Sequence, residues 1–271
     1  MDGPAPLFVV PLTIEGQDAG GAIVDTGGGF EVLLKDRFGL AVVDTAPVVA
    51  FAGPQNVDLT EPFQYVAGGL RTEADAGIVE PTICNCNGLG VRFLRKSGLT
   101  LVIDYATPSV YFVRRPPDAD AYVPFQQGPT PLEDFDTAFV TVQIDAGGEP
   151  LTLRALLDTG ASVTVLKRGI FPSLPGLDRL SIGISHPVFG EATASAGLFD
   201  TEGIPDLIIG NDVMRRWGDL WFFVFEPQGG WVGFTKQAVA PIDETLGIAA
   251  KGRASTTEVS HPLRLMQMGQ K

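Results

Sequence analysis

Short hydrophobic runs separated by turn-forming residues occupy most of the chain, and this pattern predicts β-strands. In the first part of the chain these runs are residues 7–14 (LFVVPLTI), 22–25 (AIVD), 31–34 (EVLL) and 63–69 (FQYVAGG). The chain contains 33 glycines and 21 prolines, which suit many tight turns better than long helices. The pattern therefore predicts an all-β protein.

The same order of runs recurs in the second half of the chain. Residues 138–144 (AFVTVQI), 151–158 (LTLRALLD) and 163–167 (VTVLK) repeat the first three runs. In both copies the second run ends in Asp-Thr-Gly and leads into a loop of small residues, DTGGG in one copy and DTGAS in the other. Self-similarity of this kind indicates an internal duplication.

The repeated unit also contains a short helix. Aligning Gly90 with Gly210 places GVRFLRK on GNDVMRR, and each segment ends in basic residues, as a helix of one or two turns would. Two strands around a turn follow in each copy, within residues 99–112 and 220–234. We therefore expect two pseudo-symmetric lobes, each a small curled β-sheet or barrel with one short helix.

The lobe boundaries are predicted from composition. Residues 1–125 form the expected N-terminal lobe and residues 126–238 the C-terminal lobe. The prolines and acidic residues of segment 114–136 are typical of a connector between them. Beyond these lobes the strand periodicity is lost, so residues 239–271 are predicted to be mostly a flexible tail.

The chain is acidic, with a formal net charge of −13 and a pI near 4.5. No basic stripe is present, so no nucleic-acid partner is expected. No run reaches the roughly 18 apolar residues of a membrane span, so membrane insertion is not expected either. The first ten residues lack the features of a signal peptide. We expect a cytoplasmic protein, or a periplasmic or secreted one if an export signal has been trimmed.

Residues that commonly bind metals are few and scattered. Cys84 and Cys86 are two positions apart, a spacing that rarely meets disulfide geometry. His186 and His261 are distant in sequence, and a zinc site needs about four ligands. Neither a metal site nor a cofactor is therefore predicted, and His186 is expected to face solvent in a loop.

The two Asp-Thr-Gly motifs are the strongest candidates for chemistry. Asp25 and Asp158 occupy the same place in the repeated unit, each at the end of an apolar strand. A carboxylate at a buried strand end is costly unless it is paired or hydrogen-bonded. Two carboxyls about 3 Å apart cannot both ionise, so one pKa is expected to rise and the other to fall. The charged member could then activate a water and the neutral member could protonate a carbonyl oxygen.

The neighbouring residues are expected to fix the geometry of this pair. Gly27 and Gly160 allow a tight turn beside each carboxyl and leave room for backbone amides to face it. Thr26 and Thr159 bring hydroxyls into the interior, where they need hydrogen-bond partners. Across a pseudo-twofold axis, each hydroxyl could reach the backbone of the opposite loop.

On these residues the chain resembles the aspartic proteases of the pepsin and retropepsin type. The matching segments are DTGG (25–28), GLGVRFL (88–94), DTGA (158–161), IIGNDVM (208–214) and WVGF (231–234). Two copies in one chain follow the pepsin plan, whereas the lobe length is nearer to that of the retropepsin-like bacterial family. The resemblance covers both predicted lobes and omits the tail.

The resemblance implies an acid-protease fold and an aspartic-type endopeptidase, a hydrolase that cleaves a polypeptide substrate without a cofactor. Because both motifs lie in one chain, a monomer would be sufficient for the site. Cleavage would be favoured at acid pH and inhibited by pepstatin. The implied residues are catalytic Asp25 and Asp158, with Thr26, Gly27, Thr159 and Gly160 supporting the geometry of the pair.

Three positions qualify this resemblance. Gly28 and Ala161 stand where pepsin-type lobes usually carry Ser or Thr, so Gly28 supplies no hydroxyl that could hydrogen-bond the Asp25 carboxylate. Tyr65 is a candidate substrate-binding residue, as an aromatic side chain lying over the substrate. The alternative for Tyr65 is a strand residue with an exposed hydroxyl.

Two other functions are compatible with paired carboxyls. A degenerate repeat would keep the fold and bind peptides without cutting them, although two intact Asp residues favour catalysis. Glycoside hydrolases also use two carboxyls, but their chemistry requires no matched Asp-Thr-Gly loops. The predicted function is therefore an aspartic endopeptidase, and the alternative is a catalytically inactive, protease-like peptide-binding protein.

Overall fold

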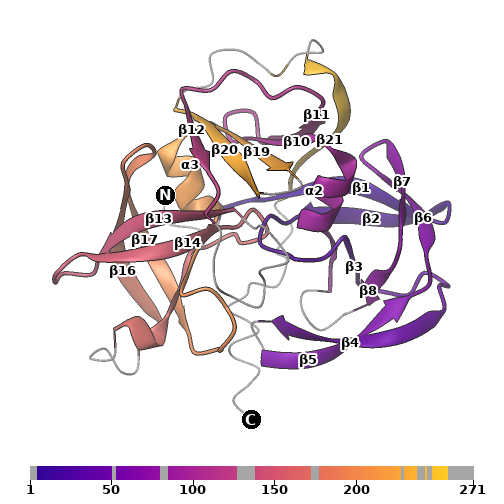
Figure 1. The fold of residues 1–271 in the computed structure, drawn as a ribbon, viewed down its shortest axis with the longest axis horizontal. Helices are drawn as coiled ribbons and strands as arrows, with labels where there is room; N and C mark the ends of the chain where they lie inside the picture. The colour runs from indigo at the N-terminus through magenta and orange to yellow at the C-terminus, as the bar shows by residue number, and fades with distance from the viewer. Residues whose placement is uncertain are drawn as a thin grey trace.

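The computed structural model describes residues 5–50, 53–79, 85–126, 138–171, 177–226, 229–236, 242 and 246–255. Within these residues the protein is mostly β, as the sequence predicts. The strands form one 15-stranded sheet and a closed barrel of β13, β14, β18, β15, β17 and β16 (Figure 1).

The elements have the following bounds. The strands of the first half are β1 (Leu7–Ile14), β2 (Gln17–Val24), β3 (Val32–Leu34), β4 (Val42–Ala50), β5 (Gly53–Thr60), β6 (Phe63–Ala67), β7 (Leu70–Ala74), β8 (Gly77–Val79), β9 (Asn87–Leu89), β10 (Thr100–Asp104) and β11 (Ser109–Val113). Those of the second half are β12 (Ala121–Pro124), β13 (Phe139–Asp145), β14 (Leu151–Leu157), β15 (Val165–Lys167), β16 (Arg179–His186), β17 (Gly190–Phe199), β18 (Leu207–Ile209), β19 (Leu220–Glu226), β20 (Gly229–Thr235) and β21 (Ile248–Ser255). The helices are α2 (Val91–Ser97), the 3-10 turn η1 (Arg168–Ile170) and α3 (Asn211–Trp217).

Hydrophobic patterning explains why these segments become strands. In β13, Val142 and Ile144 are buried while Thr141 and Gln143 are exposed, so one face packs on the core and the other meets solvent. In β10 every residue is buried, because Leu101 and Ile103 pack in one hydrophobic cluster and Val102 packs in another. Continuous apolar runs are typical of strands covered on both faces.

Strand pairing around the two Asp-Thr-Gly motifs is the same in both halves. β2 runs parallel to β9, which pairs antiparallel with β3. β14 likewise runs parallel to β18, which pairs antiparallel with β15. The helices α2 and α3 then begin after Gly90 and Gly210, the two glycines that the sequence alignment equates.

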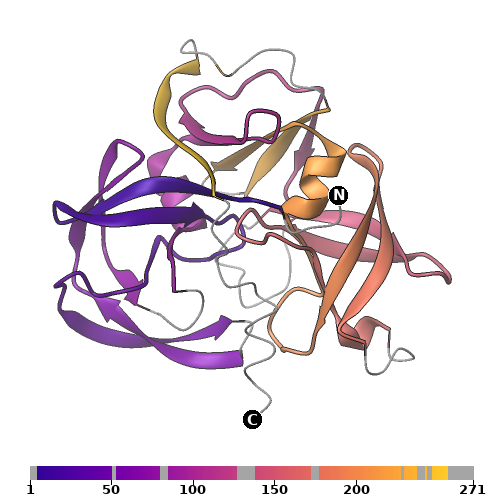
Figure 2. The same cartoon turned by 180° about the vertical axis from the view of Figure 1, so that it is seen from behind.

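The halves differ in the hairpin β4–β5, which lies between β3 and β6 in the first half. Between β15 and β16 the described residues contain only η1. β4 is the last strand in the order of the large sheet, so its outer edge has no strand partner among the described residues. Figures 1 and 2 show this hairpin at the end of the first half opposite to β10 and β11.

The large sheet joins the two halves of the chain. β10 of the first half pairs with β19 of the second, and β21 lies between β11 and β1. The prediction of a mostly flexible tail from residue 239 is therefore wrong for residues 248–255, which form β21. This strand is rich in small and basic residues, so it gives no hydrophobic signal. Gly252 permits its close approach to β1, because a Cβ atom there would lie 2.0 Å from the Val9 carbonyl oxygen.

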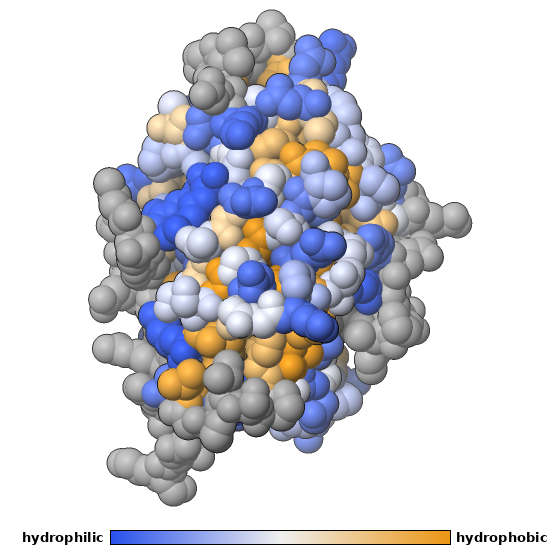
Figure 3. Space-filling view, turned by 90° about the vertical axis from the view of Figure 1, so that its left-hand side faces the viewer, coloured by the Kyte–Doolittle hydropathy of each residue, from blue (hydrophilic) through white to orange (hydrophobic). Residues whose placement is uncertain are grey.

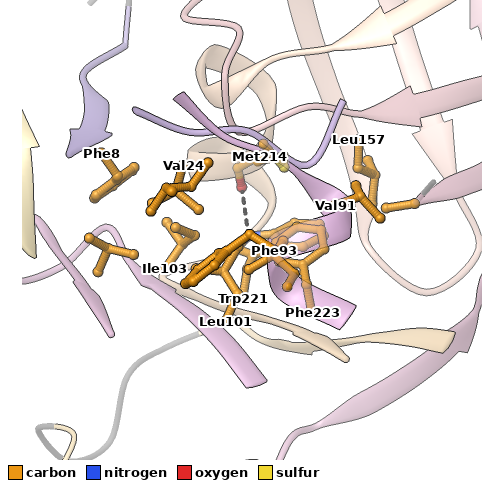
Figure 4. Close-up of a cluster of buried hydrophobic side chains, with 14 of the residues drawn as sticks. Phe8, Val24, Val91, Phe93, Leu101, Ile103, Leu157, Met214, Trp221 and Phe223 are labelled. Carbon is orange, nitrogen blue, oxygen red and sulfur yellow. Dashed lines mark hydrogen bonds between the residues drawn. The ribbon is translucent and has the colours of Figure 1, made fainter. Parts of the chain in front are cut away.

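The core is also continuous between the halves. One cluster of buried side chains includes Phe8 and Val24 from the first half and Leu157 and Trp221 from the second (Figure 4). In this cluster the indole Nε1 of Trp221 donates a hydrogen bond to the Met214 carbonyl oxygen at 3.1 Å. The sheet and the core thus join the two halves of the chain into one packed unit.

The described surface shows hydrophobic and polar side chains interspersed. On the face that Figure 3 presents, hydrophobic residues are separated by hydrophilic ones. The large hydrophobic side chains that are most exposed lie on separate elements: Val43, Tyr122, Leu151, Leu177 and Val188. None of the described helices has the length and hydrophobicity needed to cross a membrane.

Candidate functional site

Asp25 and Asp158 follow directly after β2 and β14. The backbone N–H of Asp25 donates to the Leu89 carbonyl oxygen at 2.9 Å, and that of Asp158 donates to the Ile209 carbonyl oxygen at 3.0 Å. The parallel partners β9 and β18 therefore fix the position of each aspartate. Asp25 is half-buried and Asp158 is 8% exposed.

Two buried threonines lock the loops together. The hydroxyl of Thr26 donates to the Leu157 carbonyl oxygen, and the hydroxyl of Thr159 donates to the Val24 carbonyl oxygen, both at 2.7 Å. Each hydroxyl also accepts from the backbone N–H of the other threonine, at 3.1 and 3.0 Å. Each hydroxyl therefore reaches the opposite loop, in the crossed arrangement that the sequence predicts.

The two glycines that follow bring the carboxyls close to the opposite loop. The Gly27 N–H donates to Oδ1 of Asp25 at 2.8 Å, and the Gly160 N–H donates to Oδ1 of Asp158 at 2.7 Å. A Cβ atom at Gly27 would lie 2.6 Å from Cγ of Asp158, and one at Gly160 would lie 2.6 Å from Cγ of Asp25. Only glycine fits at either position without displacing a carboxyl.

The two carboxyls share a hydrogen bond and are both desolvated. Burial raises the pKa of Asp25, although hydrogen bonds from Asp158 and from the backbone of Gly27 and Gly28 oppose this rise. Burial raises the pKa of Asp158 further, and the charge of Asp25 adds to that shift. The sequence predicts that one pKa falls, but the desolvation of both groups raises both values.

The position after the first motif has a steric explanation. A Cβ atom at Gly28 would lie 2.4 Å from Cε1 of Phe30 and 2.8 Å from Oδ2 of Asp25. The Phe30 ring therefore occupies the space that a serine or threonine side chain would need. Ala161, the equivalent residue of the second loop, is 2% exposed and belongs to an apolar cluster with Val163.

The start of each helix supports one loop. The N–H of Val91 donates to the Gly28 carbonyl oxygen and the N–H of Asn211 donates to the Ala161 carbonyl oxygen, both at 2.8 Å. The second helix also contributes a side chain, because Nδ2 of Asn211 donates to the carbonyl oxygens of Thr159 and Ala161 at 2.8 and 3.0 Å.

A tyrosine from the first half completes this arrangement. The hydroxyl of Tyr105 donates to Oδ1 of Asn211 at 2.5 Å. Sequence reasoning missed both residues. The available signal was the alignment of Asn211 with Val91, which puts a polar side chain at an otherwise apolar position. No sequence signal pointed to Tyr105, since its contact joins residues 106 positions apart.

Behind the second loop lies a further buried polar pair. The hydroxyl of Thr164 donates to Oδ1 of Asp212 at 2.8 Å and accepts from the Gly210 N–H at 3.2 Å. Burial raises the pKa of Asp212, and its hydrogen bonds and the charge of Arg216 oppose this rise. The second loop is thus backed by polar contacts.

The structure does not bring Tyr65 to the carboxyl pair. Its side chain is 1% exposed and packs in the core against Phe63 and Phe93. Its hydroxyl donates to Oε1 of Glu31 at 3.1 Å, and the ammonium group of Lys96 lies 3.3 Å from the same oxygen. Tyr65 is a core residue because alternate residues of β6 face inward, a burial that the FQYVAGG pattern does not distinguish from a surface strand.

Two further expectations differ from the structure. His186 is 7% exposed and stacks on Phe189 with ring centroids 4.1 Å apart, so it is a core histidine rather than a solvent-facing one. Cys86 is disulfide-bonded, although the spacing of the cysteines disfavours a disulfide, and Cys84 lies outside the described residues. The described residues contain no cluster of His, Cys, Asp and Glu that could hold a metal ion.

Comparisons with known proteins give a fold likeness and no family. No protein-family model matches the chain, and no curated protein matches it. The fold is similar to that of basic 7S globulin from soybean, with 10% identity and a TM-score of 0.43 over 87% of this chain and 98% of that one. It is also similar to conglutin gamma, a basic 7S globulin from lupine seeds, with 10% identity and a TM-score of 0.44 over 88% of this chain and 96% of that one.

These comparisons correct the identification that the paired motifs suggest. The two structures named above are seed globulins and not pepsin or retropepsin-type proteases, and no protein-family model matches the chain. The assignment to those proteases, and the aspartic-type endopeptidase and hydrolase activity implied by it, are therefore withdrawn. At 10% identity and TM-scores below 0.5, the likeness in turn carries no property of the globulins over to this chain.

Proposed function

We propose that the protein is a protease-like binding protein that holds an extended polypeptide segment against the Asp25 and Asp158 carboxyls without cleaving it. In this proposal residues 1–125 and 126–238 act as two pseudo-symmetric halves, each supplying one carboxyl loop. The observation that carries the proposal is the hydrogen-bonded, desolvated and partly accessible carboxyl pair.

The chemistry of this pair suits a peptide group. With both pKa values raised, a protonated carboxyl can donate a hydrogen bond to a peptide carbonyl oxygen, and its neighbour can accept one from a peptide N–H. Such bonds are strong where water is excluded. The crossed threonines and the two glycines support the proposal because they hold both carboxyls in one fixed orientation.

The hairpin β4–β5 offers a second point of attachment. The outer edge of β4 lacks a strand partner among the described residues, so an extended peptide could add a strand to it. On β5, the side-chain Nε2 of Gln55 is buried and has no hydrogen-bond partner among the described residues. A peptide carbonyl would satisfy this donor, and buried donors are normally satisfied.

Two features favour holding the peptide over cleaving it. A general base that activates water must be ionised, and desolvation raises the pKa of both carboxyls. In addition, the Phe30 ring fills the space beside Asp25 where a hydroxyl donor would stabilise the charged form. Both loops come from one chain, so the proposed site requires only a monomer.

The test uses unfolded casein peptides with the full chain, from pH 3 to pH 8. Fluorescence anisotropy measures binding and mass spectrometry measures cleavage. We expect the peptides to bind the wild-type protein and to remain intact, and binding to weaken at least tenfold in Asp158→Asn. The matched control is Asp145→Asn, because exposed Asp145 accepts the same local hydrogen bond, from the Gly147 N–H at 2.7 Å, on a distant turn.

Two results would overturn the proposal. Cleavage that disappears in Asp158→Asn would make the protein a peptidase. Absence of binding at every pH by a folded wild-type sample would remove the peptide-binding function altogether.

A further inference from the structure

We propose that Asn211, oriented by Tyr105, is a positioning residue that fixes the Asp158 loop opposite the Asp25 loop and thereby tunes the carboxyl pair. The effect on peptide affinity rests on the proposed function. The effect on the carboxyls themselves does not, because it depends only on the contacts of the two loops.

Asn211 holds the backbone on both sides of the glycine that touches both carboxyls. Its side chain is fully buried, and Nδ2 donates to the Thr159 and Ala161 carbonyl oxygens, at 2.8 and 3.0 Å. Gly160 lies between these two residues, and its N–H binds Asp158 while its Cα packs against Asp25. A shift of residues 159–161 therefore moves the N–H group that donates to Asp158 and the Cα atom that packs against the Asp25 carboxyl.

Tyr105 completes the hydrogen bonds that hold the Asn211 amide. A buried asparagine could rotate its side chain by half a turn and exchange its oxygen and nitrogen, but the two loop carbonyl oxygens only accept, so the amide nitrogen faces them. The Tyr105 hydroxyl then donates to the remaining oxygen, Oδ1. With its oxygen and both amide protons paired, the side chain has no competing hydrogen bond to make.

Tyr105 is itself held rigidly. Its N–H donates to the Asp219 carbonyl oxygen at 2.7 Å, and its ring packs edge-on against Phe8 with centroids 5.3 Å apart. Burial and the charge of Asp212 raise the pKa of Tyr105 well above its ordinary value, while Arg215 opposes this shift. The hydroxyl therefore remains a donor across the range in which the carboxyls titrate.

The first loop has an apolar residue at the equivalent position. Val91 stands where the second half has Asn211 and has no polar side-chain atom, and the Phe30 ring packs on Gly28, Gly88 and Gly90. Substitutions at Asn211 and Tyr105 should consequently act on the Asp158 loop first. If Asn211 only stabilised its helix, its substitution would affect the Asp25 and Asp158 loops equally.

The experiment compares Tyr105→Phe, Asn211→Ala and Asn211→Asp with the control Tyr65→Phe. Tyr65 is a buried tyrosine whose hydroxyl also donates a side-chain hydrogen bond, to Oε1 of Glu31 at 3.1 Å, but it does not contact either loop's carboxyl. Three quantities are measured for each full-length protein: the melting temperature, the affinity for pepstatin, and the pKa values of the Asp25 and Asp158 carboxyls by carbon-13 NMR.

We expect Tyr105→Phe and Asn211→Ala to weaken pepstatin binding by about tenfold, the change that corresponds to losing one well-made hydrogen bond. Both variants should also shift the Asp158 titration. Asn211→Asp should lose affinity at neutral pH, because a carboxylate repels the two carbonyl oxygens. It should recover relative to wild type as the pH falls and its carboxyl becomes a donor. Tyr65→Phe should lower only the melting temperature.

The outcomes separate the two proposals. If Tyr105→Phe lowers the melting temperature as Tyr65→Phe does but leaves the Asp158 titration at its wild-type value, the positioning role is wrong. If wild type binds neither pepstatin nor the casein peptides, the proposed function fails, and the carboxyl titrations of the free protein still decide the positioning role. Tyr105→Phe, which removes a single oxygen atom, serves alone if Asn211→Ala does not fold.

Discussion

The two aspartate loops share a backbone and differ in what lies behind it. Both begin at the end of a strand flanked by a parallel partner, and both are locked by the crossed threonine hydrogen bonds. Behind the first loop lie Phe30 and Val91, whereas behind the second lie Asn211 and the Thr164–Asp212 pair. The shared contacts set where the carboxyls are, and the unshared ones give the first loop an apolar support and the second loop a polar one.

The largest effect is expected from substitutions that remove the crossed threonine hydrogen bonds, which both loops share. Thr159→Val keeps the β-branched shape but deletes a donor to the Val24 carbonyl oxygen and an acceptor for the Thr26 N–H. Leaving these buried groups unpaired should reduce the free energy of unfolding by about 2–4 kcal/mol. Thr26→Val should cost the same within about 1 kcal/mol, because its contacts mirror those of Thr159. Urea unfolding of both variants measures the two values, and unequal losses would show that the lock is not reciprocal.

A smaller effect is expected from crowding the carboxyls. A Cβ atom added by Gly160→Ala would meet Cγ of Asp25 at 2.6 Å, and one added by Gly27→Ala would meet Cγ of Asp158 at the same distance. Each change should cost about 1–3 kcal/mol of stability, as overpacking does, and should abolish pepstatin binding. Gly148→Ala is the control, since a Cβ atom there would meet no other atom. Thermal unfolding measures the loss of stability, and calorimetry measures pepstatin binding. Normal pepstatin binding by either loop variant would contradict the prediction.

The smallest effect is expected from substituting one of the two carboxyls, and the resulting change in stability should depend on pH. The pKa of Asp158 is raised in the folded protein above 3.8, the value expected when the chain is unfolded. As the pH rises through this window, the unfolded chain loses its proton before the folded protein does, so the group makes the folded state progressively less stable. Asp158→Asn should therefore stabilise the protein at neutral pH, by about 1–2 kcal/mol, and give no advantage at a pH below 3.8.

Asp25→Asn should behave in the same direction with a smaller gain, since its pKa is raised less and the group is more accessible. Chemical denaturation at several pH values checks both variants. A stability difference that does not change with pH would mean that neither carboxyl titrates abnormally in the folded protein.

The sequence predicts the shared features well because they follow from local patterns. Apolar runs ending in Asp-Thr-Gly identify the strands, the loops and the crossed threonines, and the aligned glycines 90 and 210 locate both helices. These features need only short-range periodicity and the requirement that buried polar groups be paired.

The features that the sequence does not reveal depend on long-range contacts. β21 pairs through backbone groups that carry no hydrophobic signal, and Tyr105 meets Asn211 only after the two halves have packed. Tyr65 and His186 are buried because aromatic rings pack against them, Phe93 on Tyr65 and Phe189 on His186. A local sequence pattern does not show which side chains other elements will cover. The motifs themselves resemble those of a protease family that the comparisons do not support.

The most direct test of the account is calorimetric titration of the full-length protein with pepstatin at pH 5, alongside Asp25→Asn, Asp158→Asn and the control Asp145→Asn. The account predicts one pepstatin bound per chain, unchanged in the control and lost in both loop variants, because the site needs one carboxyl from each half of a single chain. Binding that survives in either loop variant, or one pepstatin per two chains, would contradict a shared carboxyl pair as the binding site.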